Sequence, residues 1–143
     1  MNTRFWIALF TILLIFAIPG AIFAQQSDFY GTWTAKITEI SDIDTMLITF
    51  TISASKFGML FAHYENNEFI EDEEFEADIA NWSSLVNTDR TSRTDYPNGY
   101  SISLSAFGFE VGSMEIFISR DRRQFTIPEI NEDFNEIIVF RKQ

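Results

Sequence analysis

Phe29-Tyr30-Gly31-Thr32-Trp33 stands at the head of a series of short segments in which apolar and polar residues alternate. The alternation is clearest in residues 45–54, and it recurs in residues 100–106 and 114–119. A period of two is typical of strands in a sheet with one buried face and one solvated face. The chain that follows the Gly-Thr-Trp stretch is therefore predicted to be built from β-strands.

Weaker strand patterns cover residues 32–40, 56–64, part of 68–78, 79–86, 124–127 and 136–141. Turn-forming residues separate the strands at Asn66-Asn67, Pro97-Asn98-Gly99 and 119–122, since Gly, Asn and Asp accept the backbone angles of tight turns. Residues 87–96 and 128–135 are expected to be loops. Eight or nine strands at hairpin spacing fit an antiparallel sandwich or an up-and-down barrel. We favour a single closed all-β barrel, because closure removes exposed strand edges.

The N-terminus has the pattern of an export signal. Arg4 is its only charged residue, residues 5–18 are almost wholly apolar, and Ala24 is a small residue at a suitable cleavage position. The apolar run is shorter than the ~20 residues that a spanning helix needs. We expect residues 1–24 to be a cleaved signal peptide and residues 25–143 to be one barrel domain. The protein is then exported, periplasmic or secreted, from a bacterium, and has no membrane span after cleavage.

Composition excludes several kinds of partner and chemistry. The chain has 21 acidic and 10 basic residues, for a formal net charge of −11. This balance argues against nucleic acid and anionic membrane surfaces, which would be repelled. The chain has no cysteine, which excludes disulfides and thiolate metal sites. We expect no cofactor.

Two short motifs resemble those of the lipocalins. Gly31-Thr32-Trp33, preceded by aromatic residues, resembles the first lipocalin motif, and Thr94-Asp95-Tyr96 resembles the second. The family also has an arginine that packs on the motif tryptophan. Arg120 has about the right spacing, but Arg141 lies on the last predicted strand, which closure places beside the first. We therefore expect Arg141 to pack on Trp33.

The resemblance implies a calycin-type barrel with a small hydrophobic ligand in its interior. Trp33 is expected to plug the closed end, with its indole N–H bonded to a backbone carbonyl. The ligand then lies away from Trp33. The candidate pocket lining consists of inward-facing apolar residues of three predicted strands: Phe50, Ile52, Phe57, Met59, Phe61, Tyr100, Ile102 and Leu104.

Other functions remain in competition with ligand binding. A barrel filled by its many phenylalanines would act through its loops as an interaction module, such as an inhibitor or an envelope accessory protein. We do not expect an enzyme or a metal site, since the single histidine, His63, has no recognisable catalytic or metal-binding motif around it. The seven acidic residues of 68–78 fit a solvated strand whose charge discourages edge pairing, or a patch for a cation or a basic partner.

Overall fold

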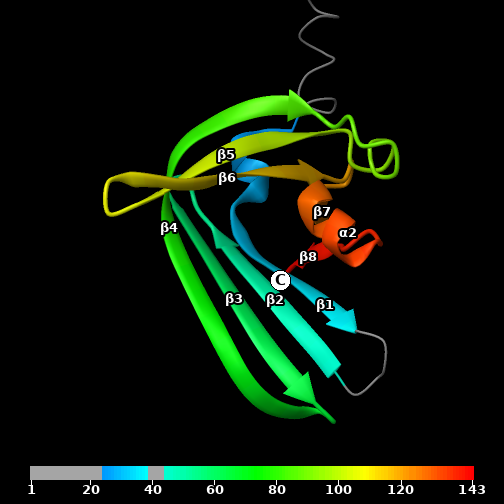
Figure 1. Ribbon diagram of the computed structural model, residues 1–143. Coiled ribbons are helices and arrows are strands. Elements are labelled where there is room, and N and C mark those ends of the chain that lie inside the picture. Colours follow the sequence, from blue (N-terminus) through cyan, green and yellow to red (C-terminus); the bar gives the residue numbers. More distant parts are fainter. Residues whose placement is uncertain (1–23, 39–43) are drawn as a thin grey trace, which may run out of the picture.

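A computed structural model describes residues 24–38 and 44–143. Eight antiparallel strands pair in chain order and close into a barrel (Figure 1). The predicted all-β up-and-down barrel is confirmed. The expected signal peptide, residues 1–24, lies outside the described residues apart from Ala24. The elements are η1 (Gln26–Phe29), β1 (Gly31–Thr38), β2 (Asp44–Ile52), β3 (Lys56–Glu65), β4 (Glu68–Val86), β5 (Asn98–Ala106), β6 (Phe109–Ile118), β7 (Gln124–Thr126), α2 (Pro128–Phe134) and β8 (Phe140–Lys142).

The acidic segment belongs to one long strand, where the sequence indicated two. β4 runs for 19 residues and pairs with β3 over its first half and with β5 over its second. A register shift between Ile79 and Asn81 lies where the expected strands would have met. No Gly or Pro falls there, and a bulge bends a strand without ending it.

Three other expectations about local structure were wrong. The segment 128–135, expected to be a loop, contains the short helix α2. Pro128 suits its first turn, and Asn135 ends it in the left-handed conformation with φ 53°. The helix occupies part of the last connection, so the final strand is only Phe140–Lys142. Asn98 and Gly99, expected in a turn, instead begin β5.

The barrel is closed by a narrow belt at one end. β8 is in register with β1 at only two positions, Trp33 with Lys142 and Thr34 with Arg141. β7 pairs with each of its neighbours at two positions as well. β1 to β4 extend well beyond this belt, so the opposite end of the barrel is open (Figure 1).

Aromatic side chains fill the barrel at the closure belt. Trp33 is fully buried and meets Phe125 at 4.7 Å between ring centroids. Phe125 stacks on Phe140 at 4.9 Å, and Phe140 packs on Phe50 at 4.7 Å. The Trp33 indole N–H donates to the carbonyl oxygen of Phe29 at 2.8 Å, as expected. Trp33 is therefore part of the solid end of the barrel.

The cation over Trp33 is a lysine and not the expected arginine. Lys142 places its Nζ 5.4 Å from the Trp33 ring centroid. Arg141 is paired with Thr34, and alternation along a strand sends its side chain to the other face from that of Lys142. Arg120, the other candidate, donates instead to the carbonyl oxygen of Thr94 at 3.4 Å. The expectation for Arg141 was wrong because the residue of β8 opposite Trp33 is Lys142, one position further along the chain.

Replacing Trp33 by Ala is expected to lower the free energy of unfolding by ~3–5 kcal/mol, the range for truncating a large buried aromatic. Lys142→Ala, which removes the exposed cation–π contact, should cost less than about 1 kcal/mol. Urea unfolding followed by fluorescence measures both. Equal losses for the two variants would contradict the role assigned to Trp33.

Gly99 marks a close approach of β5 to β6. A Cβ at this position would overlap the carbonyl oxygen of Ile116, whereas a Cβ at Gly58 would lie in ordinary contact, 3.7 Å from Thr51 Cβ. We expect Gly99→Ala to destabilise the barrel by about 3 kcal/mol or more, because the clash is with backbone. Gly58→Ala, the matched control, should change stability by less than about 0.5 kcal/mol. Similar melting temperatures for the two variants would contradict the close approach of β5 to β6 at Gly99.

Candidate functional site

The residues expected to line a pocket fall into two groups. Most are buried in the packed core, with exposed fractions between 0% and 6%: Phe50, Ile52, Phe57, Ile102 and Leu104. The others, Met59, Phe61 and Tyr100, are partly exposed and pack against that core. Tyr100 lies at the closed end, where its ring meets Phe29 at 5.9 Å. Of the eight, Phe61 borders the hollow at the open end.

The second lipocalin-like motif lies at the closed end. Tyr96 is buried, and its hydroxyl donates to Gln124 Oε1 of β7 at 3.2 Å. Thr94 accepts the bond from Arg120, and Asp95 is exposed. Together with Gly31, which starts β1 at φ 125°, these residues support the closure and lie away from the open end.

The loop that carries this motif is held by buried polar contacts. Asn87 is 4% exposed, and its amide donates to Ser92 Oγ at 3.0 Å and to the carbonyl oxygen of Tyr96 at 2.9 Å. The Ser92 hydroxyl donates to Asp89 at 2.8 Å. This bond, joined by those from Thr91, lowers the pKa of Asp89. The polar loop is thus ordered by its own side chains.

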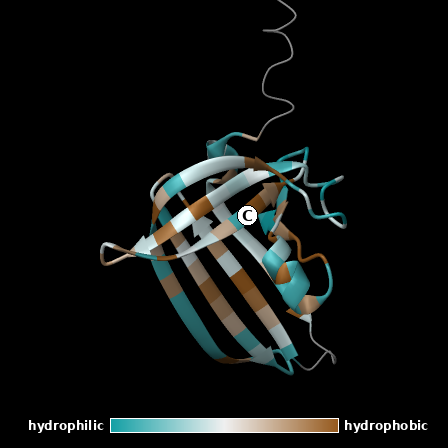
Figure 2. Ribbon diagram, turned by 45° about the horizontal axis from the view of Figure 1, so that its top comes forward, coloured by the Kyte–Doolittle hydropathy of each residue, from teal (hydrophilic) through white to brown (hydrophobic). Residues whose placement is uncertain are grey.

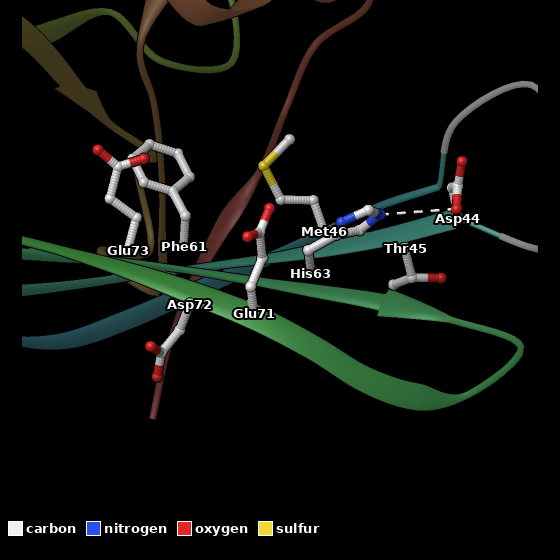
Figure 3. A pocket seen from close by; sticks show the side chains of 8 residues that line it. All are labelled: Asp44, Thr45, Met46, Phe61, His63, Glu71, Asp72 and Glu73. Atoms are coloured by element: carbon white, nitrogen blue, oxygen red, sulfur yellow. Dashed lines mark ion pairs between the residues drawn. The ribbon is translucent and has the colours of Figure 1, made fainter.

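The open end of the barrel contains a hollow of about 670 Å³ (Figure 3). Its lining comes from the ends of β2, β3 and β4: Asp44, Thr45, Met46, Phe61, His63, Glu71, Asp72 and Glu73. Met46 and Phe61 supply apolar surface, whereas Glu71 and Glu73 point to the same side of β4 as these groups (Figure 3). Asp72 points to the other side. The mouth, as we call this hollow, therefore combines apolar walls with an acidic rim.

A bulge decides which carboxylates face the mouth. Near the Asn66-Asn67 turn, Tyr64 is opposite Phe69, but one residue further His63 is opposite Glu71. The register thus shifts by one residue, with Ile70 as the extra residue of β4. A one-residue shift exchanges the two faces of a strand. Without it, Asp72 and Glu74 would occupy the inner face in place of Glu71 and Glu73.

His63 lies at the rim among acidic groups. Its Nε2 is 3.6 Å from Asp44 Oδ1, and Asp44, His63 and Glu65 each offer an atom within 4.8 Å of the others. Asp44 and Glu65 are directly opposite each other on β2 and β3. These residue types can bind a divalent cation, and two of the three, Asp44 and His63, also line the mouth. Sequence patterns did not reveal the group, because the β2–β3 register brings it together.

Comparison with protein-family models, with curated proteins and with solved structures found no match for this chain. The closed eight-stranded barrel is compatible with a calycin-like fold. Within residues 24–38 and 44–143, no helix is long and apolar enough to cross a membrane. The case for a function therefore depends on the geometry of the site.

The lowered pKa of Asp89 predicts a pH effect on stability. Because the pKa of Asp89 is lower in the folded protein than in the unfolded chain, its ionised carboxylate stabilises the fold. This stabilisation is complete above the pKa of the unfolded chain and is lost as pH falls through the pKa of the folded protein. Asp89→Asn removes the titrating group, so the variant should lose less stability than the wild-type protein between neutral and acidic pH. Urea unfolding of both proteins across this range measures the difference. Parallel curves would contradict the assignment.

Proposed function

We propose that this protein binds a small molecule in the mouth, and that the ligand joins an apolar part to a positively charged group. The observation that carries the proposal is the hollow of about 670 Å³ at the open end of a barrel whose other end is filled. Ligand sites typically have volumes of ~300–1,000 Å³ and mostly apolar walls with a few placed polar groups. The lipocalin-like motifs at the closed end support the same class, a small-molecule carrier exported from the cell.

The charge of the ligand is inferred from the rim. Asp44, Glu71 and Glu73 contribute carboxylates to the lining, and none of the lining residues is lysine or arginine. An anion such as a fatty acid would meet like charges there and would be disfavoured. An alkylammonium group would meet opposite charges while its chain contacts Met46 and Phe61. The expected hydrophobic ligand thus becomes a cationic amphiphile.

The competing class is an interaction module without a small-molecule ligand. The packing of the closed half favours the interaction module. Five of the eight candidate lining residues are buried in the core of that half, so no space remains there for a ligand. The two classes differ in what occupies the open half. Binding at the mouth requires the inner-face carboxylates of β4, whereas an interaction module without a ligand does not.

Decyltrimethylammonium and undecanoate have the same ten-carbon alkyl chain and opposite charge, so they form a matched pair of probes. We expect calorimetry to show binding of the cation and at least tenfold weaker binding of the anion, a difference of about 1.4 kcal/mol or more. Glu71→Gln/Glu73→Gln should weaken cation binding at least about fivefold, because both carboxylates face the mouth. Glu110→Gln/Glu115→Gln, on exposed positions of β6, makes the same charge change elsewhere and should leave binding unaltered.

Several results would contradict the proposal. Equal affinity for both probes would show that the acidic rim does not select the charge of the ligand. Equal weakening of cation binding by the two double variants would show that only the net charge of the protein matters. Absence of binding by either probe, in a protein that melts cooperatively, would favour the interaction module.

A further inference from the structure

One edge of the sheet is left open. Residues 68–77 of β4 pair with β3 on one side, and β5 joins β4 only from Asp78 onward. Within the part of the chain that the structure describes, no strand pairs with the other side of this segment. Residues 68–76 are all exposed. The segment therefore offers a row of unpaired backbone N–H and C=O groups roughly 30 Å long, at about 3.3 Å per residue.

The side chains along this edge are strongly acidic. Residues 68–77 contain six carboxylates and no basic residue. The register places Asp72, Glu74 and Glu76 on the outer face, opposite Ala62, Leu60 and Gly58 of β3. Figure 2 shows this part of β4 as a mostly hydrophilic band. An exposed edge with regularly spaced charges of one sign selects its partner by charge as well as by backbone pairing.

Apolar groups accompany the carboxylates. Phe69, Ile70 and Phe75 are 55%, 48% and 36% exposed along the same segment. On the outer face, a second hollow of about 800 Å³ is lined by Glu74 and Glu76 together with Phe107, which is 98% exposed at the tip of the β5–β6 hairpin. An added strand would therefore find both charged and apolar neighbours.

We propose that the open edge of β4 binds an extended basic segment of a partner protein by strand addition. Backbone groups of the segment pair with residues 68–77, and alternate Lys or Arg side chains lie beside Asp72, Glu74 and Glu76. A second copy of this chain is disfavoured as the occupant, because pairing two such edges would bring like charges together. The proposal is independent of ligand binding in the mouth, which depends on Glu71 and Glu73 of the inner face.

A labelled peptide of alternating Lys and Val, matched in length to residues 68–77, is the probe. Fluorescence anisotropy with the protein should show binding that weakens with salt. A Lys-Pro peptide has the same charge, but proline cannot donate to a ladder, so it should bind at least about tenfold more weakly. A Glu-Val peptide should not bind. Hydrogen exchange should show slowed exchange within residues 68–77 when the Lys-Val peptide is bound.

The variant Glu74→Lys/Glu76→Lys should abolish binding of the Lys-Val peptide, since it reverses the charge of two outer-face positions. Glu132→Lys/Asp133→Lys makes the same charge change on exposed positions of α2, on the other side of the barrel (Figure 1), and should weaken binding less than about twofold. Both variants change exposed side chains only, and a cooperative melt confirms that each is folded.

Three results would overturn the proposal. Equal binding of the Lys-Val and Lys-Pro peptides would show attraction by charge without strand addition. Equal loss of binding in the two double variants would show that the edge has no special role. A dimer in sedimentation, with slowed exchange of residues 68–77 before any peptide is added, would make a second copy the occupant.

Discussion

The fold depends on the packing of Trp33, Phe125 and Phe140 where the barrel closes. β1 and β8 meet at only two register positions, so their ladder contributes few hydrogen bonds. Closure must therefore come mainly from apolar burial in this belt, where the three rings are wholly buried. The hydrogen bond from the Trp33 indole N–H to the Phe29 carbonyl oxygen fixes the orientation of the indole ring. It also satisfies the one polar atom of the largest side chain in the belt. Lys142 completes the arrangement from above the Trp33 ring.

This narrow closure also explains why the other end of the barrel is open. β7 and β8 have three residues each, whereas β2 to β4 have between nine and 19. Long strands that continue past a short belt leave a curved sheet with a hollow on its inner side and an unpaired edge along β4. The filled end and the two candidate binding surfaces are thus consequences of one mismatch in strand length.

The acidic segment of β4 serves both surfaces because its residues alternate between two faces. The shift at Ile70 turns Glu71 and Glu73 toward the mouth and leaves Asp72, Glu74 and Glu76 outside. Both sets remain exposed, so their charges cost little desolvation and stay available to a partner. Variants can separate the two sets, since neighbouring positions of one strand belong to different environments.

Local patterns in the sequence were enough to predict most of the strands, their antiparallel order, the closed barrel and the burial of Trp33. These features follow from alternation, turn residues and the need to cover apolar faces, which are all visible along the chain. Which cation covers Trp33, which carboxylates enter the mouth and which edge remains open were decided by the tertiary structure. Each depends on register between strands, and a shift of one residue reverses the direction of every side chain that follows. The Gly31-Thr32-Trp33 stretch thus predicts how the barrel is closed, while the bulge at Ile70 and the lengths of β7 and β8 determine what its open end presents.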